Sequence, residues 1–218
     1  MINKSTLEFL KALKKNNDRN WFEKNRDKYE SAKDDFEQFV SELIKELAKI
    51  NPVLGSLKAK DCVFRIYRDV RFSKNKAPYK TNMGAYFVEG GKKSPKAGFY
   101  IQVEPGNSFI AGGCWMPQAP ELKKIGQEID YNLADFEKIL KAAAFKKLFK
   151  ELDDTRLKTN PKGYDSENPA IKHLRQTSFI VDMKLSDAAF TQKDLVKKSG
   201  AVYKSMKPFL DFLNTAMS

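Results

Sequence analysis

The residues best suited to chemistry gather in one segment, residues 64–80, where arginine, lysine and tyrosine alternate with apolar side chains. Between positions 65 and 80 there are six basic residues and one acid, a net charge of +5. Basic side chains at this density can hold phosphate or carboxylate groups, arginine through a planar fork of N–H donors. The segment therefore predicts an anion-binding site with these ligands: Arg68, Arg71, Lys76, Tyr79 and Lys80.

Arg68 is the most informative residue of this segment. If residues 62–72 form a strand, Arg68 lies on the face that also carries Ile66 and Val70. A charge on an otherwise apolar face must be paired or bound, because burying an unpaired charge is costly. Two interpretations stay open. Arg68 binds a ligand, or it forms a buried ion pair with an aspartate or glutamate that fixes the sheet.

A second segment, residues 158–165, again combines lysine and tyrosine with a rigid turn, and Arg175 follows it. Its composition matches that of the first segment although the two lie far apart in the sequence. We expect both segments to contribute to one anion site. The additional ligands would be Lys158, Lys162, Tyr164 and Arg175.

Motifs of established catalytic chemistry are missing from the sequence. There is no P-loop, no G-x-S-x-G, no H-E-x-x-H and no G-x-G-x-x-G. His173 is the only histidine, and Cys62 and Cys114 form no Cys-x-x-Cys pair. We therefore expect no metal site and no cofactor, and we expect both cysteines to be reduced residues of the core. No reaction is assigned, and whether the protein is an enzyme stays open.

Composition narrows the class of protein. The 218 residues can bury a substantial core, and 41% hydrophobic with 31% charged residues excludes an intrinsically disordered chain. No apolar run approaches the roughly 20 residues of a membrane span, and the first residues have no signal-peptide core. We therefore expect a soluble, cytoplasmic protein. The formal net charge of +12 favours a polyanionic partner.

The periodicity of apolar residues predicts the elements that position these segments. Helical spacing occurs over residues 5–16 and 21–50, again from Pro120 to about residue 149, and in a terminal helix near 194–213. Alternation with a period of two predicts strands at residues 62–72, 83–88, 98–103, 109–114 and 178–185. Short connections between consecutive strands favour antiparallel pairing. The sequence thus predicts one α+β domain over residues 1–218, a central, mainly antiparallel sheet with helices packed from the N-terminal and C-terminal thirds.

One long motif is specific enough to suggest a family: Phe64-Arg65-Ile66-Tyr67-Arg68-Asp69-Val70-Arg71-Phe72-Ser73-Lys74-x-Lys76-x-Pro78-Tyr79-Lys80. Together with matching residues at 16–29, 98–117, 161–175 and 207–213, it resembles a widespread family of uncharacterised proteins, a domain of unknown function of about this length. The resemblance covers nearly the whole chain and implies its boundaries, but it brings no activity, cofactor or catalytic residue. Gly126 departs from the pattern, which has an arginine there. If that arginine lines a pocket in relatives, this chain lacks one contact.

Three functions remain open at this point. The first is a pocket for a phosphate- or carboxylate-bearing small molecule, lined by the nine residues named above. The second is nucleic-acid binding, favoured by the positive charge and by aromatic residues between basic ones. The third is a non-catalytic structural or interaction protein in which the arginine network holds the sheet together. None of the three involves a membrane, and the oligomeric state is not specified.

Overall fold

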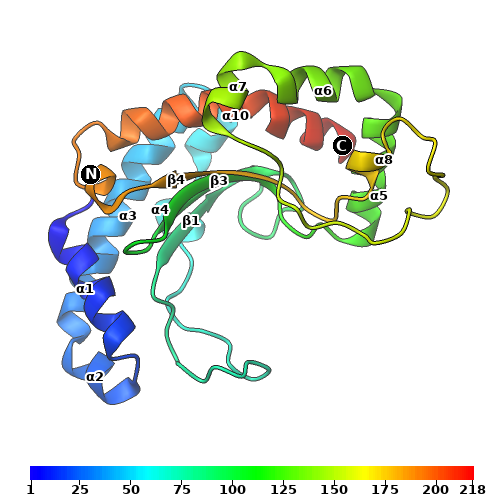
Figure 1. The fold of residues 1–218 in the computed structure, drawn as a ribbon. Helices are drawn as coiled ribbons and strands as arrows, with labels where there is room; N and C mark the ends of the chain where they lie inside the picture. Colours follow the sequence, from blue (N-terminus) through cyan, green and yellow to red (C-terminus); the bar gives the residue numbers. More distant parts are fainter. The chain divides into compact units, whose positions relative to one another are not determined.

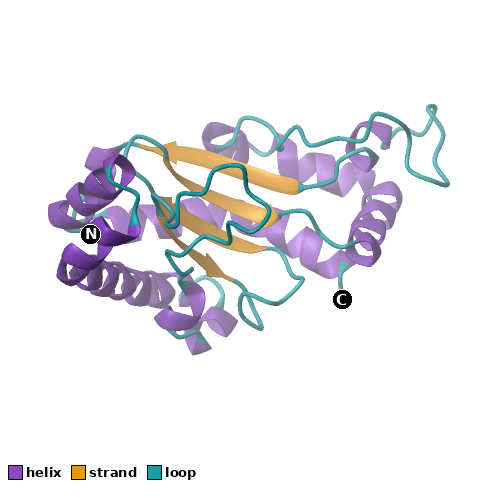
Figure 2. Cartoon of the chain, turned by 90° about the horizontal axis from the view of Figure 1, so that it is seen from below, coloured by secondary structure: helices purple, strands orange, loops and turns teal.

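The computed structural model describes residues 1–218 and has an α+β fold, with ten α-helices and one four-stranded antiparallel sheet. The strands lie in the order β1-β2-β3-β4 and are seen side by side in Figure 2. The fold class predicted from the sequence is therefore confirmed. The elements are α1 (Lys4–Lys15), α2 (Arg19–Lys24), α3 (Arg26–Ala48), the 3-10 helix η1 (Pro52–Ser56), α4 (Ala59–Cys62), β1 (Met83–Phe87), β2 (Gly98–Val103), β3 (Ser108–Cys114), α5 (Ala119–Tyr131), α6 (Leu133–Lys141), α7 (Ala143–Leu148), α8 (Ile171–Leu174), β4 (Phe179–Leu185), α9 (Asp187–Phe190) and α10 (Leu195–Ala216).

The chain forms two compact units, each assembled from three segments. The chain passes from one unit to the other five times, once directly after β1 and then within β2, β3, β4 and α10. The prediction of a single domain over residues 1–218 stays a prediction. Unit 1 contains residues 1–87, 100–110 and 184–201, and unit 2 contains residues 88–99, 111–183 and 202–218.

Unit 1 is built on the pairing of α1 with α3 (Figure 1). The apolar stripe of α1 is buried, and so is the long apolar face of α3. Burial of such stripes is the main source of helix stability in a folded protein. The carboxylate of Asp35 on α3 joins the two helices, because it accepts hydrogen bonds from the backbone and side-chain nitrogens of Asn3 and from the Thr6 hydroxyl.

The helix predicted over residues 21–50 is divided at Asn25 into α2 and α3. The side-chain amide of Asn25 donates to the carbonyl of Trp21, at 2.9 Å, and the backbone there leaves the helical region at ψ 23°. Asparagine competes with helical hydrogen bonds in this way, so that it favours helix ends over helix interiors. The break separates the short helix α2, which carries Arg19 and Glu23, from α3.

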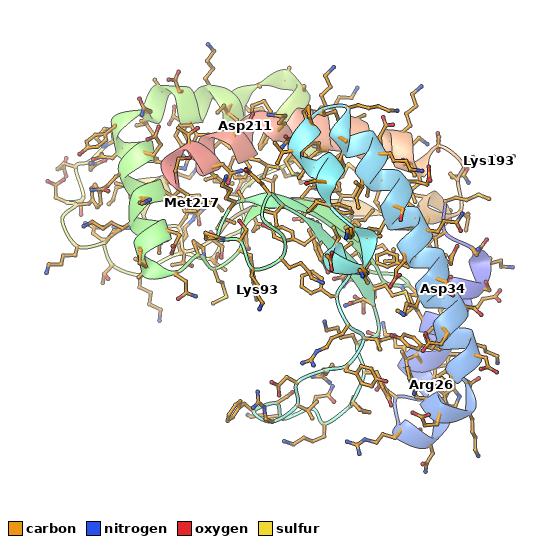
Figure 3. All side chains as sticks on the ribbon, turned by 180° about the vertical axis from the view of Figure 1, so that it is seen from behind. Arg26, Asp34, Lys93, Lys193, Asp211 and Met217 are labelled. Carbon is orange, nitrogen blue, oxygen red and sulfur yellow. The ribbon has the colours of Figure 1, made fainter.

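The strand predicted over residues 62–72 is wrong. Cys62 ends α4, and residues 64–80 form a long hairpin, here called the basic hairpin, that extends away from the strands (Figures 1 and 3). Its two arms are joined by bonds from Lys80 N to the carbonyl of Ile66 (2.7 Å) and from Arg68 N to the carbonyl of Pro78 (2.9 Å). Within the hairpin the structure has one isolated antiparallel bridge, between Tyr67 and Tyr79, and a two-stranded ribbon without a third strand is only marginally stable.

Unit 2 packs helix α10 against its part of the sheet. Met206 lies against Gly112, where a larger residue would collide with its sulfur, and the rings of Phe99 and Tyr203 meet at 5.5 Å. Helix α5 contacts both α6 and α8, and α6 also contacts α7. None of the helices of the protein is both long enough and apolar enough to span a lipid bilayer.

Both cysteines are buried thiols outside any disulfide, as predicted, Cys62 in unit 1 and Cys114 in unit 2. Burial raises the pKa of the Cys114 thiol to about 11, and the nearby carboxylate of Glu121 adds to the shift. The thiol is therefore protonated at neutral pH and is a poor nucleophile. Cys114 is a residue of the core.

Candidate functional site

A cavity of about 350 Å³ lies in unit 1 where helix α2 meets the basic hairpin. This volume is at the lower end of the range of small-molecule sites, roughly 300–1,000 Å³. Two arginines, one glutamate and two tyrosines combine in its lining with two apolar residues. The lining residues are Arg19, Glu23, Tyr67, Arg68, Val70, Pro78 and Tyr79.

Tyr79 anchors the hairpin on helix α2. Its ring stacks on that of Phe22, with centroids 3.9 Å apart, and only 4% of the residue is exposed. The side chain of Asn17 holds the same residue by its backbone. Asn17 Nδ2 donates to the carbonyl of Tyr79 at 3.0 Å, and Asn17 Oδ1 accepts from its N–H at 3.1 Å. The floor of the cavity is thus fixed by one stacked ring pair and two hydrogen bonds.

Arg68 is half-buried, and both of its hydrogen-bond partners are neutral. Nη1 donates to the carbonyl of Ala77 at 2.9 Å, and Nη2 donates to the hydroxyl of Ser73 at 3.2 Å. A guanidinium has five N–H donors, so three of them are not used by these bonds. One of the two interpretations of Arg68 from the sequence was a buried ion pair with an aspartate or glutamate. This interpretation is wrong, because Arg68 has no carboxylate partner.

The other charges of the cavity are unevenly matched. The carboxylate of Glu23 pairs with Arg26 at the start of α3, at 3.2 Å (Arg26 is labelled in Figure 3). The exposed Arg19 takes part in no ion pair. The lining therefore holds two arginines without a carboxylate partner and one glutamate whose charge is already compensated.

Tyr79 adds a hydrogen-bond donor to these charges. Burial raises the pKa of its phenol above the usual value, and the neighbouring Tyr67 and Glu23 contribute to the rise, while Arg19 and Arg26 oppose it. The phenol is therefore protonated at neutral pH. In that form it can serve as a hydrogen-bond donor and carries no negative charge that would repel an anion.

Three of the predicted hairpin ligands are outside the cavity lining, each with a local contact. The guanidinium of Arg71 is paired with Asp69, at 2.6 Å between Nη2 and Oδ2. The ammonium of Lys76 donates to the carbonyl of Val70 at 3.1 Å. Lys80 Nζ lies 5.5 Å from the centre of the Phe64 ring, which is a cation–π contact.

The second predicted segment belongs to unit 2. Arg175 donates from Nε and Nη2 to the side-chain oxygen of Asn160, at 3.0 and 2.5 Å, which ties Arg175 to this segment. Lys158 and Lys162 are exposed. Tyr164 is half-buried, and burial together with the nearby Asp130 and Tyr131 raises the pKa of its phenol. The prediction that this segment shares a ligand with the basic hairpin stays a prediction.

Arg19 and Glu23 are the lining residues that reasoning from the sequence did not select. They are separated from the hairpin by about 45 positions, and a helix with mixed charges gives no sign of a pocket. The available signal was the motif at residues 16–29, which contains Arg19 and Trp21 and forms part of the family resemblance.

The fold and the site define an α+β protein with a basic, tyrosine-lined cavity beside a hairpin. A family model described as "Conserved hypothetical protein (DUF2461)" matches residues 5–212, so the chain belongs to this family. The resemblance inferred from the sequence is thereby confirmed. Searches of curated proteins and of solved structures gave no match.

Proposed function

We propose that the cavity of unit 1 binds a small molecule that carries a phosphate or carboxylate group. The observation that supports this most is the half-buried guanidinium of Arg68, which has only neutral partners and three unused N–H donors. A cation in such a place gains most from an anion, because hydrogen bonds between ionised groups are stronger than those between neutral ones. Arg19 lies on the same cavity and supplies a second guanidinium.

The remaining lining supports a ligand with a ring or an apolar part. Val70 and Pro78 are apolar, and the ring of Tyr67 is 40% exposed. A tyrosine ring offers a flat surface to another ring, while its hydroxyl can bond to a polar group. The proposed ligand is therefore larger than a bare inorganic anion, with its charge at Arg68 and its body along Tyr67.

The test is a calorimetric titration of the purified chain with inorganic phosphate, followed by sugar phosphates, nucleoside monophosphates and dicarboxylates. The variant is Arg68→Met, which keeps the length of the side chain and removes its charge. We expect it to weaken binding roughly ten- to hundredfold, because a hydrogen bond to a charged group contributes about 1.5–3 kcal/mol. Arg68→Lys keeps the charge but loses the fork, so we expect an intermediate loss.

Arg71→Met is the matched control, since Arg71 lies three positions away in the same hairpin and is already paired with Asp69. We expect its affinity for the anion to stay close to that of the unmodified chain. Equal losses in both arginine variants would contradict a specific pocket. If Arg68→Met lowers the unfolding free energy and no anion binds even the unmodified chain, the arginine is architectural and the proposal is wrong.

The same titration examines the second predicted segment. The variant Lys158→Ala/Lys162→Ala removes two exposed ammonium groups of unit 2. If the two segments hold one ligand, the double variant weakens binding of the same anion that Arg68→Met weakens. An unchanged affinity would restrict the site to the cavity of unit 1.

A further inference from the structure

We infer that the tip of the basic hairpin binds single-stranded nucleic acid, with Phe72 as a stacking platform. Phe72 is 96% exposed, the highest value among the large apolar side chains of the protein. Leaving a phenylalanine ring in water forgoes the free energy that its burial would gain. A partner that covers the ring would recover that energy. This inference rests on the hairpin tip and not on the proposed cavity.

Local contacts define the hairpin tip around Phe72. The guanidinium of Arg71 lies over the Phe72 ring, 5.8 Å from its centre, and is itself fixed by Asp69. The turn is closed by the bond from Ser73 N to the carbonyl of Val70, at 3.3 Å. Since the ring remains almost fully exposed with Arg71 over it, a nucleobase can stack on it and extend the series of planar groups.

The charge around Phe72 matches a phosphate backbone. Four basic residues of the hairpin are exposed, while Asp69 is the one acid between residues 65 and 80. Sequence-tolerant binding of single strands combines basic grooves with aromatic side chains on which bases stack. The exposed basic residues are Arg65, Arg71, Lys74 and Lys76.

A single strand fits the tip better than an anionic membrane does. Phe72 is the one apolar side chain fully exposed there, because Val70 is half-buried and Ile66 is 3% exposed. Arg71 and Lys74 flank Phe72, so the tip offers a membrane one exposed ring and no apolar face of the kind that interfacial anchors bury. Stacking on a base leaves both charges at the surface, next to phosphates.

The test measures fluorescence anisotropy of a labelled oligothymidine, about 12 nucleotides long, at low salt with the full chain. We expect Phe72→Ala to weaken binding about tenfold or more, which is the usual effect of losing one stacked base. Phe72→Trp keeps a stacking ring and should bind about as tightly as the unmodified chain. Lys74→Gln should lower the slope of log K against log salt by about 0.7, the value for one phosphate contact of a single strand.

Tyr131→Ala is the matched control, because Tyr131 is 78% exposed but lies in unit 2, away from any comparable cluster in sequence. We expect it to leave oligonucleotide affinity unchanged, and Arg68→Met should also leave most of it in place. Phe72→Ala binding as tightly as the unmodified chain would overturn the inference. The inference would also be overturned if the unmodified chain did not bind the oligonucleotide. Binding to vesicles that contain phosphatidylserine, without binding to the oligonucleotide, would indicate a membrane as the partner instead.

Discussion

Arg68 and Arg71 lie three positions apart, yet their partners differ in charge. Arg71 is paired with Asp69, whereas Arg68 donates to the Ala77 carbonyl and the Ser73 hydroxyl. Both residues are equally basic in the sequence and both were predicted as ligands. What separates them is the direction of each side chain in a hairpin that is not a regular strand, which alternation alone cannot give.

Asn17 is the residue that fixes Tyr79 beside the cavity, through two hydrogen bonds to its backbone. We expect Asn17→Ala to lower the free energy of unfolding by about 1–3 kcal/mol, because it leaves a buried donor and acceptor unsatisfied. Urea denaturation followed by circular dichroism gives this value. Asn16→Ala is the control, since Asn16 is exposed and its side-chain amide bonds to the Ala12 carbonyl of the adjoining helix α1. Equal losses in the two variants would contradict the role of Asn17.

At the scale of elements, the regular parts of the fold were predicted well. The strand predicted at residues 98–103 is β2, and those predicted at 83–88, 109–114 and 178–185 differ from β1, β3 and β4 by one residue at an end. These segments follow a simple rule, because their side chains alternate between two faces of a sheet. The helix predicted at residues 5–16 likewise corresponds to α1.

The errors fall where local hydrogen bonds override periodicity. At Asn25 a side-chain amide bonds to the Trp21 carbonyl, which also accepts from the Asn25 backbone N–H, and apolar spacing says nothing about such a side-chain bond. The basic hairpin alternates like a strand but has no neighbour to complete a sheet. Its turn also places Phe72 at the tip, so a residue predicted on an apolar face is 96% exposed. The candidate cavity could be predicted only in part, since Arg19 and Glu23 of α2 come to lie beside the hairpin only when the chain folds.

Replacing either of two glycines by alanine tests the packing around α5 and β3, and the two replacements should change the free energy of unfolding in opposite directions. Gly126 lies inside α5, where an added methyl group meets only ordinary contacts, the nearest at 3.7 Å from Leu174. Gly126→Ala should therefore raise the free energy of unfolding by about 0.5–1 kcal/mol through helix propensity. Gly113 in β3 has φ 133°, and its added methyl group would collide with the carbonyl of Phe179. Gly113→Ala should lower the same free energy by more than about 2 kcal/mol.

Urea denaturation of the two glycine variants side by side measures both effects. A destabilising Gly126→Ala would contradict the open space beside α5. A neutral Gly113→Ala would contradict the close approach of β3 and β4 in unit 2.

At the scale of the whole molecule, neither unit is a continuous stretch of chain. Each consists of three segments, and four of the five changes from one unit to the other occur inside β2, β3, β4 and α10, while the fifth follows the end of β1. Separate domains are usually joined by exposed linkers that few contacts cross. Continuous strands and a continuous helix are not linkers of that kind, which favours a single cooperative unfolding transition.

The two cysteines report on this cooperativity, because Cys62 lies in unit 1, Cys114 lies in unit 2, and both are buried. We expect pulsed alkylation at increasing urea concentration to label both thiols with the same midpoint, as measured for each cysteine by peptide mass spectrometry. The match is expected because the chain cannot unfold one unit without breaking elements that continue into the other. Two well-separated midpoints would contradict the single domain predicted over residues 1–218.

The most direct test of the proposed function locates a bound anion in the protein. Crystals soaked in selenate, a tetrahedral dianion like phosphate, would reveal its position by anomalous scattering. We expect a peak in the cavity of unit 1 within hydrogen-bond distance of the Arg68 guanidinium, a peak that is lost in Arg68→Met and kept in Arg71→Met. Selenate bound elsewhere, with nothing beside Arg68, would contradict the proposal that this cavity is an anion-binding site.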